Sequence, residues 1–255
     1  AGLFFMASLT GKVALITGAS RGLGKAMALA LAQQGADLAL VARDRTALEA
    51  TAGAARAHGT RVEVFAADVS REASVQDLEK QVSALYPRIS ILVNNAGINL
   101  RKNLVDFTLE EWSSVMDTNL TSVFLMCRAF IPHMKGQGYG RIINMTSIMS
   151  HVSLPQRTAY SASKTALLGL NRALAQELAP DGITVVGISP GPFLTEMNLP
   201  ISQNPEANAA FLAKIPAGRW GQVDEIGQLA AFLCSDGAGF ITGTDIVIDG
   251  GWCAA

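Results

Sequence analysis

The chain has 255 residues, of which 49% are hydrophobic and 16% are charged, and its formal net charge is −1. A chain of this size and composition can bury one large core, and its balanced charge argues against a nucleic-acid-binding face. No apolar run reaches the ~18 residues that a membrane-spanning helix needs. Neither nucleic acid nor a membrane is therefore an expected partner.

The cysteines Cys127, Cys234 and Cys253 are odd in number and far apart, which fits neither a disulfide framework nor a metal site. We therefore expect reduced thiols, no bound metal and a cytoplasmic location. Residues 1–8 lack the basic start of a signal peptide, so they are expected to be an N-terminal extension or a cloning remnant. A single folded domain is expected over 9–255.

Short β-branched runs alternate with amphipathic stretches along the chain, which predicts strands separated by helices. Because the strands are almost continuously apolar, we expect a doubly wound parallel sheet of about seven strands, with helices on both faces. The expected strands are Lys12–Thr17, Asp37–Val41, Arg61–Ala66, Ile89–Val93, Arg141–Thr146, Thr184–Ile188 and Asp245–Ile248. The expected helices cover 22–34, 44–57, 71–85, 109–134, 158–179 and 223–234.

One long irregular stretch, 189–222, carries five prolines. Loops of this length inside compact domains are usually functional, so we expect a substrate-binding loop here. A short helix near Glu206–Lys214 is expected to interrupt it.

Three glycines, Gly18, Gly22 and Gly24, follow the first strand and open the first helix. This is the context of the dinucleotide-binding loop of a Rossmann fold. Glycine permits the tight turn and lets backbone N–H groups approach a pyrophosphate at the helix N-terminus. Because these glycines lie after a strand and before a helix, cofactor binding is favoured over the role of ordinary turn residues.

The end of the second strand indicates which dinucleotide is bound. Ala42 offers no acceptor for a ribose 2′-hydroxyl, whereas Arg43 and Arg21 could clamp a 2′-phosphate. Asp44 is interpreted as the N-cap of the helix 44–57. The local chemistry favours NADP, although NAD stays possible.

Tyr160 and Lys164 stand four residues apart in the expected helix 158–179 and so share one face. A cation about 4 Å from a phenol is worth about 4 kcal/mol, or roughly three pKa units. A tyrosine perturbed in this way would be a usable proton donor near neutrality. Ser147, thirteen residues earlier at the end of an apolar strand, favours an acid–base pair over a surface pair.

From about Leu9 to Trp252 the chain resembles the short-chain dehydrogenase/reductase family. The glycine motif Thr17–Gly24, the Asn94-Asn-Ala-Gly97 stretch and Pro190-Gly191 with Thr195 follow the family in chain order. The family's catalytic tetrad is matched by Asn119, Ser147, Tyr160 and Lys164.

The resemblance implies a role for each member of that tetrad. Tyr160 would protonate the substrate oxygen as hydride arrives from the cofactor, while Ser147 hydrogen-bonds the same oxygen. Lys164 would lower the tyrosine pKa and hold the nicotinamide ribose, and Asn119 would support a water in the proton relay. The implied cofactor-binding residues are Gly18, Ser20, Arg21, Gly22, Leu23, Gly24, Arg43, Asp68, Val69, Asn95, Ala96, Gly97, Tyr160, Lys164, Pro190, Gly191, Phe193 and Thr195.

The substrate pocket is expected near the carboxyl ends of the strands. Arg101 could pair with a substrate carboxylate, and His151 is either a polar contact or a solvent-facing loop residue. Asn99 could instead simply hold a turn. The candidate residues are Asn99, Arg101, Met149, His151, Arg157, Phe193 and Met197.

The favoured function is an NADP-dependent oxidoreductase acting on a secondary alcohol or ketone, with a polyol or sugar acid as substrate. Ser147–Ser150, Pro190–Phe193 and Ala217–Gly221 resemble gluconate 5-dehydrogenase-like members of the family. The alternatives are a 3-oxoacyl-carrier-protein reductase of fatty-acid synthesis and a non-catalytic nucleotide-sensing protein. The resemblance also implies a homotetramer.

Overall fold

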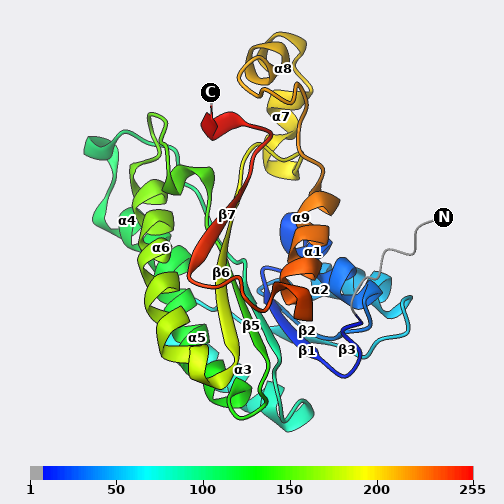
Figure 1. Ribbon diagram of the computed structural model, residues 1–255. Helices are drawn as coiled ribbons and strands as arrows, with labels where there is room; N and C mark the ends of the chain where they lie inside the picture. Colours follow the sequence, from blue (N-terminus) through cyan, green and yellow to red (C-terminus); the bar gives the residue numbers. More distant parts are fainter. Residues whose placement is uncertain (1–7, 255) are drawn as a thin grey trace, which may run out of the picture.

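The computed structural model describes residues 8–254, apart from the side chains of Met197 and Pro200. Its sheet contains seven strands in the order β3-β2-β1-β4-β5-β6-β7, and every neighbouring pair is parallel (Figure 1). The predicted doubly wound parallel sheet is therefore confirmed. The strands are β1 (Val13–Thr17), β2 (Asp37–Ala42), β3 (Val62–Ala66), β4 (Ile91–Asn94), β5 (Gly140–Met145), β6 (Ile183–Pro190) and β7 (Thr244–Ile248).

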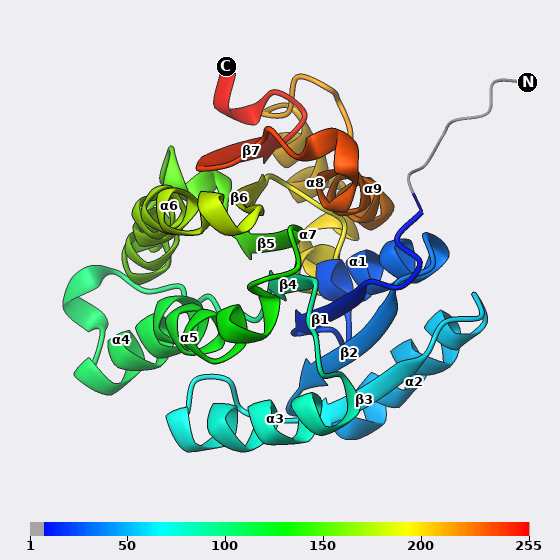
Figure 2. The ribbon, with the colours of Figure 1, turned by 60° about the horizontal axis from the view of Figure 1, so that its bottom comes forward.

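Helices cover both faces of the sheet, as Figures 1 and 2 show. One face carries α1 (Gly22–Gln33), α2 (Arg45–Arg56) and α9 (Val223–Cys234), and the other carries α3 (Glu72–Leu85), α4 (Leu109–Met116), α5 (Ser122–Met134) and α6 (Thr158–Leu178). Each face has its own apolar cluster. Ile16 of β1 belongs to the α1 side and its neighbour Leu15 to the α3 side, because successive strand residues point to opposite faces.

Two helix starts are capped by side chains, and the sequence predicted one of the two caps, Asp44. Asp44 accepts a 3.0 Å hydrogen bond from the backbone N–H of Ala47, which confirms it as the N-cap of α2. Asn204 caps α8 (Pro205–Leu212) through a 3.0 Å bond from Ala207 N. The stretch 189–222 also contains α7 (Leu199–Ser202), and α8 corresponds to the short helix expected near Glu206–Lys214.

The helix expected over 109–134 differs from the prediction in one respect. A π-helical segment, Asp117–Thr121, separates α4 from α5 and contains Asn119. Such turns are rare and occur frequently at functional sites. Within residues 8–254, no helix combines the length and apolar character that a membrane crossing requires.

The strand order reverses between β1 and β4, because β2 and β3 continue the sheet to one side and β5, β6 and β7 to the other. In open α/β sheets, ligands bind in the crevice at such a switch point, outside the carboxyl ends of the strands. The fold therefore directs attention to the segments that follow β1, β4, β5 and β6.

Candidate active site

The loop between β1 and α1 is built to admit an anion. Arg21 is the N-cap residue of α1, but its side chain makes no capping hydrogen bond, and the first turn of α1 holds no acidic residue. The backbone N–H groups of that turn are therefore open to an anionic ligand. A Cβ at Gly24 would collide with the carbonyl of Gly18, so only glycine fits there. These features fit the pyrophosphate of a dinucleotide.

Asn95 fixes this glycine loop to the end of β4. Its Nδ2 donates 3.0 Å hydrogen bonds to the carbonyls of Thr17 and Gly18. In return, Thr17 Oγ1 accepts from the backbone N–H groups of Asn95 (3.0 Å) and Ala96 (3.1 Å). Thr17 was not predicted to contribute its side chain to the site. Its hydroxyl at the last position of a buried strand is the feature of the sequence that could have indicated this role.

The residues expected around the adenosine follow β1, β2 and β3, at the carboxyl ends of the strands. Arg43 is exposed directly after β2. Arg21 is exposed as well, but its Nη1 lies 3.3 Å from Oε2 of Glu196, in the loop 189–222. Glu196 is a contact that the sequence did not predict. Asp68 accepts from the backbone N–H (3.1 Å) and hydroxyl (2.6 Å) of Ser70, the contacts of an ordinary turn residue.

Tyr160 and Lys164 occupy the first two turns of α6, as their spacing predicts. The Nζ of Lys164 is 5.9 Å from the centroid of the Tyr160 ring and donates a 2.6 Å hydrogen bond to the carbonyl of Met145. Ser147 follows β5 and begins the 3₁₀ turn Ile148–Ser150, where its Oγ accepts from Met149 N at 3.1 Å. Ser147 and Lys164 are almost fully buried.

The pKa values of this pair differ from the expectation. Burial raises the pKa of Tyr160, and a hydrogen bond from Ser147 and the charge of Arg157 offset only part of that effect. Burial lowers the pKa of Lys164 to about 8. The expected lowering of the Tyr160 pKa by Lys164 is therefore not found in this structure. The physical reason is that burial disfavours both the phenolate and the ammonium.

Asn119 is fully buried in the π-helical segment, and its side chain bridges two parts of the site. Its Oδ1 accepts from Ile98 N at 2.8 Å, and its Nδ2 donates to Ile98 O at 2.9 Å. The same Nδ2 donates to Ser163 Oγ of α6 at 3.0 Å. These contacts anchor the loop after β4 against α6, and the role of Asn119 in a water relay stays a prediction.

Of the two arginines expected near the substrate, Arg157 acts on Tyr160 and Arg101 acts on Arg157. Burial and the charge of Arg101 both lower the pKa of Arg157, and the charge of Arg157 in turn acts on the Tyr160 hydroxyl. Arg101 itself is exposed. In the loop after β4, the buried Oδ1 of Asn99 has no hydrogen-bond partner among the described residues. An unpaired buried acceptor is costly unless a ligand or water completes it.

Three of the remaining candidates, His151, Phe193 and Met149, contact other parts of the protein or are buried. His151 is not a free loop residue, because its Nε2 lies 2.7 Å from Oδ2 of Asp245 on β7. Phe193 is 4% exposed and packs over Gly221, so its side chain belongs to the core. Met149 is buried as well. The side chain of Met197 lies outside the described part of the structure.

Comparison with known proteins supports one class of enzyme. A family model described as Enoyl-(Acyl carrier protein) reductase matches residues 18–253. D-threitol dehydrogenase of Mycolicibacterium smegmatis is 43% identical over 246 residues, covering 96% of this chain and 94% of that protein. A 3-oxoacyl-[acyl-carrier-protein] reductase of Synechocystis is 40% identical over 248 residues, covering 96% and 98%.

A solved structure from Beutenbergia cavernae has the same fold, with a TM-score of 0.91 at 34% identity, and covers 97% of this chain and 99% of its own. That structure is described as an NAD(P)-dependent gluconate 5-dehydrogenase with NADP bound at low occupancy.

Proposed function

The chain belongs to the short-chain dehydrogenase/reductase family, and on that premise we propose that it is an NADP-dependent oxidoreductase that interconverts a secondary alcohol and a ketone. The observation that carries the proposal is the juxtaposition of Tyr160, Ser147 and Lys164 beside a glycine loop open to an anion. A protein that only senses nucleotides has no need of this acid–base arrangement.

A bound nicotinamide dinucleotide supplies hydride transfer to or from the reacting carbon. The chain's own residues handle the proton. Tyr160 donates it to the carbonyl oxygen during reduction, since a phenol, whose ordinary pKa is about 10, is protonated at neutral pH. Ser147 Oγ hydrogen-bonds the same oxygen and holds it beside the phenol. Lys164 lies on the same face of α6 and holds the nicotinamide ribose.

The choice of NADP rests on the residues after β2. Ala42 has no group that accepts a hydrogen bond from a ribose 2′-hydroxyl, and the exposed Arg43 follows it. Arg21 supplies a second guanidinium once a 2′-phosphate competes with Glu196 for it, because that ion pair is solvent-exposed and weak. The NADP in the Beutenbergia structure is in keeping with this choice.

The substrate class that we propose is a polyol or, more narrowly, a sugar acid. The charge of Arg157 acts on Tyr160 and the charge of Arg101 acts on Arg157, so a substrate carboxylate beside Arg157 would pair with positive charge. Two relatives carry the names of compounds of this type, D-threitol and gluconate. A 3-oxoacyl-carrier-protein reductase remains the second candidate, favoured by the 40% identity to the Synechocystis enzyme.

The deciding experiment is a substrate panel with the purified protein. Ketones and alcohols would include sugar acids, their neutral polyols and a 3-oxoacyl thioester, each tested with NADP(H) and with NAD(H). Absorbance of the reduced nicotinamide reports turnover. We expect the highest kcat/KM for a polyol or sugar acid with NADP(H). Preference for the thioester would select the second candidate, and cofactor binding without turnover of any compound would reject the enzyme.

We further propose a cytoplasmic homotetramer. Phe240, which precedes the edge strand β7, is 102% exposed, Phe232 of α9 is 52% exposed, and Leu109 of α4 is 80% exposed. Exposed apolar groups of this size are candidates for subunit contacts. The three cysteines are free, which is in keeping with a reducing compartment.

A further inference from the structure

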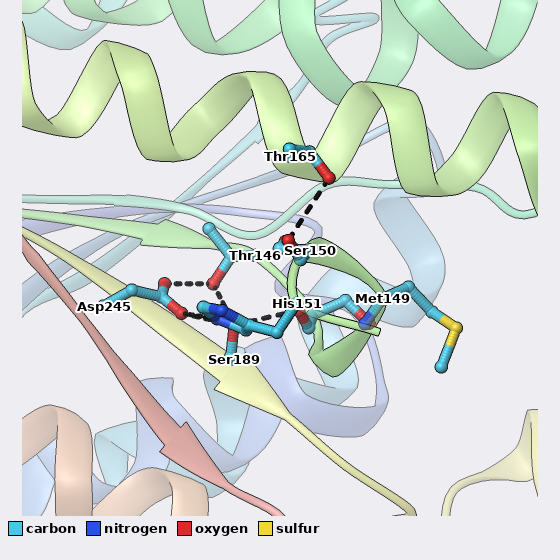
Figure 3. Close-up of polar contacts among 8 residues, drawn as sticks. Thr146, Met149, Ser150, His151, Thr165, Ser189 and Asp245 are labelled. Carbon is cyan, nitrogen blue, oxygen red and sulfur yellow. Dashed lines mark hydrogen bonds and ion pairs between the residues drawn. The ribbon is translucent and has the colours of Figure 1, made fainter. Parts of the chain in front are cut away.

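A polar cluster beneath α6 connects the edge strand β7 to the segment that carries Ser147 (Figure 3). Its centre is the carboxylate of Asp245, whose side chain is 8% exposed. Thr146 Oγ1 donates to Asp245 Oδ1 at 2.5 Å, and Ser189 Oγ lies 2.5 Å from Asp245 Oδ2. The Nε2 of His151 lies 2.7 Å from the same Oδ2.

Both oxygens of a carboxylate accept hydrogen bonds, so one side chain can hold the hydroxyls of Thr146 and Ser189 and the imidazole of His151. A buried carboxylate is also costly without such partners. The neighbouring strand β6 has a residue without a side chain next to the Asp245 carboxylate. Gly187 of β6 pairs with Asp245 in the sheet, and a Cβ at Gly187 would collide with Oδ1.

The donors to Asp245 bracket Ser147 along the chain. Thr146 precedes it directly, and His151 follows at the end of the turn Ile148–Ser150. Ser189 Oγ also lies 2.9 Å from the carbonyl oxygen of Ser147. The single proton of Ser189 serves one acceptor at a time, so its hydroxyl bridges the carboxylate and the backbone of Ser147.

The other side of the same turn is fixed to α6. Thr165 Oγ1 donates to the carbonyl of Ser150 at 3.4 Å, as Figure 3 shows. Because α6 also carries Tyr160, this contact relates the Ser147 turn to the proton donor. The turn is thus held between two supports, one on α6 and one on β7.

We propose that Asp245 is a positioning residue, which sets the place of the Ser147 hydroxyl relative to Tyr160 through Thr146, Ser189 and His151. The proposal rests on the function proposed above. Catalytic groups must be held at fixed positions relative to the reacting atoms, because a displacement of about 1 Å can cost roughly a hundredfold in rate. A purely structural Asp245 would instead lower stability and leave kcat per folded molecule unchanged.

The test is a double-mutant cycle between Asp245→Asn and Ser147→Ala. Asp245→Asn keeps the shape of the side chain but offers one acceptor oxygen and turns an NH₂ group toward donors. We expect kcat to fall about tenfold to a hundredfold in Asp245→Asn, with the Kd for NADPH little changed. In the Ser147→Ala background the same substitution should cost little more, because its effect passes through Ser147. Losses that multiply in the double variant would overturn the proposal.

Two further variants serve as a control and as an independent test of the proposal. Thr244→Ala, an exposed neighbour on β7, should keep the wild-type kcat. Ser189→Ala removes only the bridging hydroxyl and should lower kcat in the same non-additive way, even where Asp245→Asn fails to fold. Additive loss in Ser189→Ala would count against the positioning role.

A crystal structure of Asp245→Asn, or of Ser189→Ala where the first variant does not fold, separates this proposal from the proposed function. We expect Ser147 Oγ to move relative to the Tyr160 hydroxyl. An unmoved Ser147 would refute positioning whether or not a substrate is known. A wild-type protein that binds NADPH but turns over no compound would instead refute the proposed function.

Discussion

The ammonium of Lys164 lies 5.9 Å from the centre of the Tyr160 ring and directs a 2.6 Å hydrogen bond to the carbonyl of Met145. The charge of Lys164 is thus partly satisfied by the backbone of β5. Burial raises the pKa of Tyr160, so the phenol in this structure is neutral and a weaker acid than an ordinary tyrosine. The Tyr160 hydroxyl therefore carries a proton in this structure, as a donor for carbonyl reduction must.

Replacing Tyr160 by phenylalanine tests that donor directly. Tyr160→Phe removes one hydroxyl and leaves the ring in place, so packing changes little. We expect turnover to be lost while the Kd for NADPH, measured by fluorescence titration, is largely retained. A purified variant with near wild-type kcat would remove Tyr160 from the mechanism.

Lys164 gives a prediction about stability and pH. Its pKa in the folded protein is about 8, below the ordinary value of about 10.4. Between these values the unfolded chain binds more protons, so folding becomes more favourable as pH rises. Burying the ammonium lowers the free energy of unfolding by on the order of 3 kcal/mol, and this loss is fully present below about pH 8.

We therefore expect the stability of the wild type, relative to Lys164→Met, to increase between about pH 7 and about pH 10. Urea unfolding of both proteins at each pH gives their free energies of unfolding, and the difference between the two is followed as pH rises. A difference that is constant, or that falls with pH, would contradict the buried, destabilised ammonium. The variant should also lose turnover, since Lys164 is proposed to hold the nicotinamide ribose.

Cofactor choice is tested at the end of β2. Arg43→Ala should raise the KM for NADP far more than the KM for NAD, because it removes a phosphate partner. Ala42→Asp combined with Arg43→Ala should shift preference toward NAD, because the carboxylate accepts from a ribose hydroxyl. Arg45→Ala, at the start of α2, is the matched control. A wild-type enzyme that already prefers NAD would contradict the assignment.

The sheet was largely predictable because its strands are nearly continuous apolar runs. β7 begins one residue before the expected Asp245, and β5 is shifted by one residue at both ends. The π-helical segment was not predictable, since a change of hydrogen-bond partner over Asp117–Thr121 leaves the apolar periodicity of the flanking helices intact.

The site was predictable where a motif places residues close in sequence, as for Tyr160 and Lys164. It was not predictable where the fold brings distant residues together. His151 and Asp245 are 94 residues apart, and Arg21 and Glu196 are 175 apart, so no spacing indicates either pair. The direction of the Tyr160 pKa also depends on burial, which the spacing of two residues does not specify.

Assembly provides a further check on the family assignment. We expect a homotetramer, because the exposed Phe240 and Phe232 and the exposed Leu109 would remain in water in a lone subunit. Light scattering at micromolar concentration should give the mass of four chains. A stable monomer would show that these side chains tolerate solvent and that the tetramer proposal is wrong.

The sugar-acid assignment depends on positive charge beside Tyr160. Arg101 follows Gly97 by four residues, on the loop after β4, and its charge acts on Arg157. A charge-assisted hydrogen bond to a carboxylate is worth roughly 1.5–3 kcal/mol. Arg101→Met should therefore lower kcat/KM for an anionic polyol acid by about ten- to a hundredfold. The neutral polyol should be affected much less, because it has no carboxylate to pair.

The matched control is Arg88→Met, since Arg88 is exposed before the start of β4, at the opposite end of the sheet. It removes the same charge from the protein and should leave kcat/KM unchanged for both substrates. Steady-state kinetics with both compounds on all three proteins measures the contrast. If Arg101→Met affects acid and neutral polyol alike, the guanidinium points into water and does not select the substrate. The carboxylate argument then fails, and the 3-oxoacyl thioester becomes the better substrate hypothesis.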